Sequence, residues 1–290
     1  MAAAGCSRCA SASSTSKRCK RSSKRCRRCS VAIDRPHLSI VIPAYNEEAR
    51  IAHTLQRVVD YFDARGEPYE VLVVSDGSTD RTETLVQQFA REHPQVKLLA
   101  YQPNRGKGHA VRYGILRAQG EQVLFSDADL ATPIEEYEKL LPALEQGYEI
   151  AIGSRPLRES QLIVRQPFYR EWAGRAFNKL VQLLAVPGIH DTQCGFKLFT
   201  GEAAHAIFSL CRLNGFSFDF EALYYARQLG YRIAEVPIRW MHQPGSKVKL
   251  LRDGLRMVRD LLWLRLTAPW RLALVRMKSD AERGEAKRRL

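Results

Sequence analysis

The feature that most constrains the fold of this chain is a regular alternation, from residue 38 onward, of short apolar runs with segments of helical periodicity. Strands are expected at 38–43, 70–75, 96–101, 122–126 and 149–153, and helices at 47–64, 79–91 and 109–118. Because the runs are apolar along most of their length, both faces of each strand should be covered. The pattern predicts an α/β domain with a mostly parallel central sheet and helices on both faces.

The excess of positive charge lies ahead of this pattern. The first 30 residues hold nine of the 45 basic side chains and no acidic one, whereas the rest of the chain has 36 basic and 31 acidic side chains. A Ser-, Lys- and Arg-rich segment with almost no large apolar residues cannot bury a core. We therefore expect a disordered basic tail at 1–34 and a nearly balanced body, which argues against a non-catalytic nucleic-acid binder.

The same tail holds five of the seven cysteines. Cys6-x-x-Cys9 and Cys26-x-x-Cys29 match the spacing of a four-thiolate zinc site. Cys19 is an odd fifth and no apolar residues accompany the set, so a polybasic arm at a membrane surface, or an extension without function, is favoured over zinc. The tail has no apolar stretch typical of a signal peptide, and with only Cys194 and Cys211 in the body we expect a reducing, cytosolic compartment.

Polar loops follow the first four expected strands, namely Pro43–Glu47, Asp76–Asp80, Asn104–Gly108 and Asp127–Asp129. The carboxyl ends of parallel strands share one edge, where open α/β sheets bind their ligands. In the second loop, Ser78 or Thr79 can cap the following helix. In the third, glycines at a helix N-terminus can bring backbone N–H groups close to an anion, and Lys107 adds positive charge.

The fourth loop places two carboxylates, Asp127 and Asp129, two residues apart, and Thr132-Pro133 resembles the cap and first residue of a helix. Mg²⁺ and Mn²⁺ prefer oxygen ligands and commonly bridge one or two carboxylates to substrate phosphates. The triplet thus predicts metal-assisted handling of a nucleotide diphosphate. The glycine patterns of dinucleotide-binding oxidoreductases and of P-loop enzymes are absent from the expected positions, which disfavours both classes.

Together these motifs resemble the family 2 glycosyltransferases with a GT-A fold, through Ile40–Glu47, Val74–Asp80, Asn104–Gly108 and Ser126–Leu130. Motifs of the second half resemble the dolichyl-phosphate (polyprenyl-phosphate) β-glucosyltransferase branch, and these are Ile152–Arg155, Asp191–Phe199, Phe218–Glu221 and Pro244–Lys247. The similarity covers about residues 37–270, in order. It implies a GT-A glycosyltransferase domain at 35–247.

The resemblance implies an inverting hexosyltransferase that moves glucose from UDP-glucose to a dolichyl or polyprenyl phosphate. Implied catalytic residues are Asp127, Asp129, Asp191 and Arg155; implied nucleotide-sugar ligands are Pro43, Ala44, Tyr45, Glu47, Asp76, Lys107 and Asp127. The implied ligands of Mg²⁺ or Mn²⁺ are Asp129, Asp127 and Gln193. Two other sugar transferases remain open: one using GDP-mannose with a lipid phosphate, and one using UDP-sugars with a glycan.

The attacking group would be a phosphate oxygen. A phosphate monoester has a second pKa near ~6, so at neutral pH it is largely a dianion and needs no strong general base. A base role for Asp191 is therefore chemically unnecessary. What the acceptor needs is positive charge, for which the candidates are Arg155, Arg165, Arg170 and Lys247. His190 reads as a plain loop residue, and Asp219 and Glu221 as a second acidic site or as partners of a helix dipole.

The C-terminal region, 248–290, is expected to form an amphipathic helix followed by a basic tail. No run approaches the ~20 apolar residues of a membrane-spanning helix. Between 249 and 265, one face is expected to carry Leu251, Leu255, Val258, Leu261 and Leu262, another face Arg252, Arg256 and Arg259, and Trp263 and Trp270 lie near the end. This composition suits either an interfacial helix on anionic lipid or a cap on the catalytic domain. We expect a peripheral protein on the cytoplasmic face of a membrane.

Overall fold

The computed structural model describes residues 35–164, 168–243 and 250–288, all of which belong to one unit. The predicted basic tail at 1–34 therefore lies outside the described residues, and so do Arg165 and Lys247.

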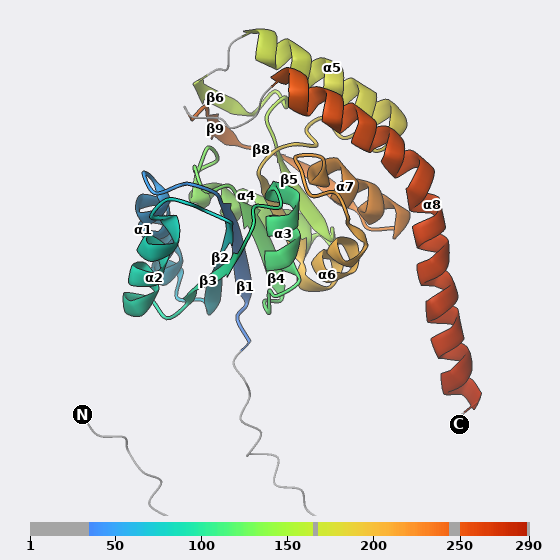
Figure 1. Ribbon diagram of the computed structural model, residues 1–290, viewed down its shortest axis with the longest axis horizontal. Helices are drawn as coiled ribbons and strands as arrows, with labels where there is room; N and C mark the ends of the chain where they lie inside the picture. The colour runs from blue at the N-terminus through green and yellow to red at the C-terminus, as the bar shows by residue number, and fades with distance from the viewer. Residues whose placement is uncertain (1–34, 165–167, 244–249, 289–290) are drawn as a thin grey trace, which may run out of the picture. The chain divides into compact units, whose positions relative to one another are not determined.

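A seven-stranded sheet forms the centre of the domain, in the order β3-β2-β1-β4-β7-β5-β8 (Figure 1). Its strands are β1 (Leu38–Ala44), β2 (Tyr69–Asp76), β3 (Val96–Tyr101), β4 (Gln122–Ser126), β5 (Ile150–Ser154), β7 (Phe196–Thr200) and β8 (Ile233–Pro237). Strands β3, β2, β1 and β4 pair in parallel, as do β5 and β8, whereas β7 runs antiparallel to both of its neighbours. The predicted mostly parallel sheet is confirmed. A separate parallel pair consists of β6 (Gln161–Val164) and β9 (Arg239–Met241).

Helices cover both faces of the sheet, because successive strand residues point to opposite sides. In β1, Ile40 and Ile42 belong to one apolar core and Val41 to the other. The first core includes residues of α1 (Ile51–Arg65), α2 (Thr82–Glu92), η1 (Ile134–Glu136) and α4 (Tyr137–Glu145). The second core includes residues of α3 (Lys107–Ile115), α5 (Phe168–Leu184), α6 (Gly201–Leu210), α7 (Phe218–Gln228) and α8 (Leu250–Arg288). The predicted α/β architecture is thus confirmed.

Helix α1 begins at Ile51 rather than at Glu47. Asn46 has φ 51°, and the carbonyl of Glu47 accepts the amide hydrogens of Arg50 and Ile51, so a turn separates the strand from the helix. Because the polar residues before the helix lie in this turn, they remain at the carboxyl edge of the sheet.

Two other helix starts also differ from the prediction. The N-cap of helix α2 is Arg81, which makes no side-chain capping bond, and not Ser78 or Thr79; the Asp80 carboxylate just before it accepts the Thr82 amide at 3.0 Å. After Thr132, the extended Pro133 leads into the short 3-10 helix η1, which has no side-chain cap. The α-helix α4 then starts at Tyr137.

Candidate active site

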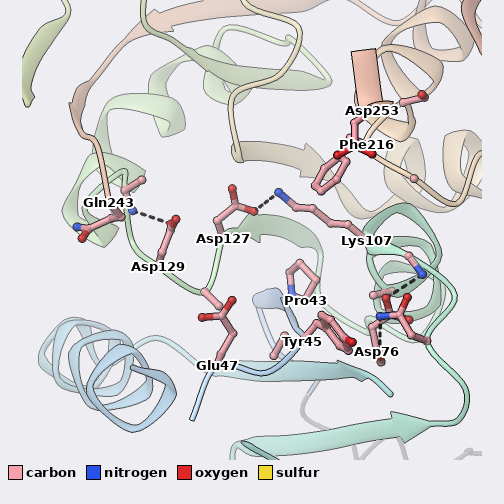
Figure 2. A pocket seen from close by; sticks show the side chains of 18 of the residues that line it. Pro43, Tyr45, Glu47, Asp76, Lys107, Asp127, Asp129, Phe216, Gln243 and Asp253 are labelled. Atoms are coloured by element: carbon pink, nitrogen blue, oxygen red, sulfur yellow. Dashed lines mark hydrogen bonds and ion pairs between the residues drawn. The ribbon is translucent and has the colours of Figure 1, made fainter. Parts of the chain in front are cut away.

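A cavity of about 500 Å³ lies at the carboxyl ends of β1, β2 and β4, as predicted for the ligand site of such a sheet (Figure 2). Its lining includes every residue expected to bind the nucleotide sugar, namely Pro43, Ala44, Tyr45, Glu47, Asp76, Lys107 and Asp127, together with Asp129. The fold therefore gathers side chains from four separate loops into one place.

The first two loops are locked together by hydrogen bonds. Asn46 donates its backbone N–H to Ser78 Oγ at 3.1 Å, and its Oδ1 accepts the amide of Thr79 at 2.8 Å. The amide of Glu47 donates to Thr82 Oγ1 at 2.8 Å, and the Glu47 carboxylate pairs with Arg50 at 2.8 Å. These bonds fix Tyr45 and Glu47, which flank Asn46, at the cavity wall.

Asp76 holds the third loop in place. Its Oδ1 accepts the Arg105 amide at 2.7 Å and the Tyr101 hydroxyl at 2.8 Å, and its Oδ2 accepts the Gly106 amide at 2.8 Å. The Gly108 amide donates to the carbonyl of Asn214 at 2.8 Å. Since both glycine N–H groups are used within the protein, they do not offer the anion site expected from the sequence. The positive charge that this loop brings to the cavity is that of Lys107.

Lys107 forms an ion pair with Asp127, with 2.6 Å between Nζ and Oδ1, and its ammonium lies 5.5 Å from the centre of the Phe125 ring. Burial favours the neutral amine, but the charges of Asp127 and Asp219 outweigh it and raise the pKa of Lys107. The lysine therefore keeps its charge at neutral pH. It offsets the negative charge of Asp127, whereas no cation among the described residues forms an ion pair with Asp129.

Asp129 receives one hydrogen bond from the described residues, from the Ala131 amide at 3.0 Å, and no ion pair. Burial, and then the charge of Asp127, raise the pKa of Asp129 above its usual range. Among the described residues no group of three His, Cys, Asp or Glu side chains is arranged to hold a metal ion. Two carboxylates nevertheless suit Mg²⁺ or Mn²⁺, provided that substrate phosphate oxygens complete the coordination.

Arg155 and Asp191 form a bidentate ion pair behind the cavity wall. Nε of Arg155 lies 2.6 Å from Oδ2 of Asp191, Nη2 lies 2.9 Å from Oδ1, and the Arg155 amide also donates to Oδ2. Burial favours the protonated acid, but the guanidinium outweighs it and holds the pKa of Asp191 below its usual range. Neither residue is among the described residues that line the cavity. Of the other residues expected at the acceptor phosphate, Arg165 and Lys247 lie outside the described residues, as does the side chain of Arg170.

The remaining candidate residues hold the surrounding loops. The backbone N–H of Gln193 donates to Asp191 Oδ1 at 3.2 Å, and the Gln193 side chain contacts Met257. His190 binds Glu235 through both its backbone amide and its ring. Asp219 pairs with buried Lys197, and Glu221 accepts the amides of Arg212 and Leu213. In the described lining of the cavity, none of these four candidates appears.

Several lining residues were not assigned to the site from the sequence: Arg50, Asn104, Phe216, Ser217, Trp240, His242, Gln243, Asp253, Arg256 and Met257. Phe216 and Ser217 directly precede the Phe218–Glu221 motif, and Gln243 precedes the Pro244–Lys247 motif. Their position next to these motifs is the sequence feature that could have placed them in the site. Arg256 was expected on a helix face only. Its place at the cavity depends on how α8 packs, which the local sequence does not specify.

Helix α8 caps the domain with a face different from the expected one. Met257, Leu261, Leu264, Ala268 and Leu272 are buried in the second core. Leu255 and Leu262 are exposed, although they share the predicted apolar face with buried Leu261. Even this 39-residue helix, like the other described helices, lacks an apolar stretch that could cross a membrane.

Residues 39–208 match the family model described as Glycosyl transferase family 2. The chain is 41% identical over 257 residues to the dolichyl-phosphate beta-glucosyltransferase of Drosophila melanogaster, covering 83% of this chain and 79% of the relative. The human protein of that name is 38% identical, covering 82% and 79%. A crystal structure of glucosyl-3-phosphoglycerate synthase from Mycobacterium tuberculosis with Mn²⁺ and UDP-glucose superposes with a TM-score of 0.59 at 20% identity, covering 79% of each chain, so the two share a fold.

Proposed function

The chain belongs to glycosyl transferase family 2 and, within it, to the dolichyl-phosphate beta-glucosyltransferases, and from this membership we propose that it transfers glucose from UDP-glucose to a dolichyl or polyprenyl phosphate. The observation that carries the proposal is the extent of the similarity. The match to the yeast relative covers 79% of this chain at 35% identity, and the match to the fly relative covers 83% at 41% identity. Both relatives are named dolichyl-phosphate beta-glucosyltransferase. The four polar loops of the first half that line the cavity fall within the family match, whereas Phe216, Trp240 and the lining residues of α8 lie beyond it.

The cavity supports a nucleotide-sugar donor. Pro43, Ala44, Tyr45 and Glu47 would enclose the base and ribose, next to Asp76, and Lys107 would approach the diphosphate from the opposite loop. Lys107 is protonated and lies at 2.6 Å from Asp127, so a diphosphate reaching Asp127 would meet a fixed positive charge. Such preorganised charge stabilises a leaving group that becomes more negative as the bond to the sugar breaks.

Asp129 and Asp127 would hold a Mg²⁺ or Mn²⁺ ion. Gln193, the third candidate ligand, is not among the described residues that line the cavity. When bound, this ion would act as a Lewis acid on the diphosphate oxygens. The protein's own contribution is to keep two carboxylates on one short turn. The Asp127 backbone N–H donates a hydrogen bond to the Gly195 carbonyl at 3.1 Å, and the Asp129 carboxylate accepts one from the Ala131 backbone N–H.

The acceptor phosphate would attack the anomeric carbon and invert its configuration from α to β. A phosphate dianion is itself the nucleophile, so the site needs cations to orient it and no strong base. Arg155 and Asp191 then act together: Asp191 fixes the guanidinium, and Arg155 lies 5.4 Å from the ring of Trp240 in the cavity wall. We propose a peripheral location on the cytoplasmic face of a membrane. The two cysteines among the described residues are buried and unbridged, in keeping with a reducing compartment.

A donor comparison tests the proposal. Purified full-length chain with Mn²⁺ or Mg²⁺ and a short polyprenyl phosphate is offered UDP-glucose or GDP-mannose, and transfer is measured by mass spectrometry of the lipid. UDP should inhibit and GDP should not. Mannosyl transfer with inhibition by GDP would instead assign the chain a different donor.

A further inference from the structure

One wall of the cavity comes from the first turns of α8, which contribute Asp253, Arg256 and Met257. Met257 is buried, whereas Arg256 is exposed although it lines the cavity. The Arg256 side chain therefore lies where the cavity opens to solvent. Figure 2 shows Asp253 of the same helix above Phe216, well separated from Glu47 and Asp129 at the donor end.

The other cations of the cavity already have carboxylate partners. Lys107 pairs with Asp127 at 2.6 Å, and Arg50 pairs with Glu47 at 2.8 Å. Within the described part of the chain, no carboxylate forms an ion pair with Arg256. Asp253, one turn earlier on α8, has an interaction of its own. Arg256 thus carries the cavity charge that is most open to an added anion.

Arg155 is less free to take this role than its sequence motif suggests. Two of its guanidinium nitrogens, Nε and Nη2, are bound by Asp191 at 2.6 and 2.9 Å. A guanidinium that already donates two hydrogen bonds to one carboxylate has fewer donors left for a second anion. An acceptor phosphate at the cavity opening therefore needs a further cation.

The outer face of α8 indicates where that phosphate would come from. Leu255, Leu262, Leu266 and Trp270 are 75%, 52%, 74% and 76% exposed. At 100° per residue these four positions lie opposite buried Met257 and Leu264, so we call them the outer stripe. Exposed Arg252 and Arg259 lie on the same side. An apolar stripe with arginines and a terminal Trp suits the interface of an anionic bilayer.

We propose that Arg256 binds the phosphate group of the acceptor, a phosphate monoester on a long isoprenoid chain. This inference rests on the proposed function. With the outer stripe in the bilayer interface, the lipid chain stays in the membrane while its phosphate reaches the cavity beside α8. A guanidinium suits this task because it offers paired donors to phosphate oxygens and does not give up its proton at neutral pH. The nucleophile thus stays ionised while it is oriented.

The test measures binding without turnover. Farnesyl phosphate is titrated into the full-length protein by calorimetry, without any donor, for the wild type, Arg256→Gln, Arg256→Lys and Arg265→Gln. Arg265 is an exposed arginine of the same helix that does not line the cavity, so it controls for the loss of one charge. We expect Arg256→Gln to weaken farnesyl phosphate binding by about ten- to a hundredfold, the scale of hydrogen bonds to charged groups. Arg256→Lys should be intermediate, and Arg265→Gln should stay within about twofold.

UDP-glucose binding by the same variants separates the outcomes. Unchanged UDP-glucose affinity in Arg256→Gln, together with weakened farnesyl phosphate binding, supports the inference. Equal farnesyl phosphate affinity in Arg256→Gln and the wild type overturns it. It is also overturned if Arg256→Gln and Arg256→Lys each lose as much affinity for UDP-glucose as for farnesyl phosphate. If the wild type binds both ligands without any sugar transfer while Arg256→Gln still weakens farnesyl phosphate binding, the proposed function fails and the assignment of Arg256 to the phosphate stands.

Discussion

The carboxylate of Asp127 fills the space that a Cβ atom on Gly195 would need. The Asp127 amide also donates to the carbonyl of Gly195 at 3.1 Å. The segment that leads into the antiparallel strand β7 thus sets the position of the carboxylate that faces Lys107. A motif of the second half of the chain supports the acidic turn of the first half.

Gly195→Ala should displace the Asp127 carboxylate, because the added methyl group meets it directly. We expect glucosyl transfer to fall at least about tenfold, since small misplacements of a positioned group are costly in catalysis. Steady-state assays with UDP-glucose and a short polyprenyl phosphate measure this. Gly174→Ala is the matched control, because a Cβ there meets nothing within 4 Å. Full activity in Gly195→Ala would contradict the positioning role of this glycine.

Lys107→Met should strengthen the binding of Mn²⁺ and weaken the binding of UDP-glucose. Without the ammonium, Asp127 loses its 2.6 Å ion pair, so Mn²⁺ added without donor should bind severalfold more tightly. UDP-glucose should bind about tenfold more weakly, since the diphosphate loses a charged hydrogen bond. Electron paramagnetic resonance titration of free Mn²⁺ and calorimetry with UDP-glucose measure the two affinities. Mn²⁺ binding that weakens in this variant would contradict our account of the pair.

Much of this donor half follows from the sequence. The apolar runs of β1 to β4 specify parallel strands, and their polar ends meet at one edge by geometry alone. The position of β7 between β4 and β5 was not predicted. Its pairing joins residues more than 70 positions apart in the chain, such as Phe125 and Lys197, and no local pattern encodes such a register. The role of Asp76 in holding the third loop likewise depends on a long-range contact with the amides of Arg105 and Gly106.

Asp191→Asn should destabilise the fold by about 3 kcal/mol at neutral pH, because it leaves the Arg155 guanidinium without its buried counter-charge. The wild-type carboxyl has a pKa below its usual range when folded and an ordinary pKa, about 3.9, when unfolded. Its stabilising effect is therefore present above about pH 4 and is lost as the pH falls through the lowered pKa.

Urea unfolding at several pH values measures this effect. The difference in unfolding free energy between the wild type and Asp191→Asn should be largest near pH 7 and shrink below about pH 4. If the difference in unfolding free energy between the two proteins does not change with pH, the Asp191–Arg155 ion pair is not the source of that difference. If transfer by folded Asp191→Asn stays near that of the wild type, the reaction does not depend on Asp191 fixing the Arg155 guanidinium.

Replacing the outer stripe should weaken membrane binding without unfolding the domain. We expect the triple change Leu255→Ser, Leu262→Ser and Leu266→Ser to reduce sedimentation with phosphatidylserine-containing vesicles at least about tenfold, because three exposed apolar side chains no longer enter the interface. Leu116→Ser, at an exposed leucine beyond the end of α3, is the control. Equal vesicle binding by the triple variant and the control would place the membrane contact elsewhere.

The C-terminal helix shows where prediction from the sequence reaches its limit. The sequence predicts the helix, its arginines and an apolar face that suits either lipid or the domain, but the face that is buried lies about a quarter-turn from that apolar face. In α8 apolar residues occur on two sides, and only packing against the second core decides which side is buried. Leu261 is buried while neighbouring Leu262 is exposed, and the hydrophobicity of the two residues cannot distinguish them.

Mass spectrometry of the lipid product tests whether this protein transfers glucose to a lipid phosphate and needs Asp129 to do so. The wild type and Asp129→Ala are incubated with UDP-glucose, Mn²⁺ and a short polyprenyl phosphate, and folding is checked by circular dichroism. We predict a glucosyl-phosphate lipid with the β configuration for the wild type and none for Asp129→Ala. Absence of product from folded wild-type protein in the presence of metal, or equal product from both proteins, would contradict the account.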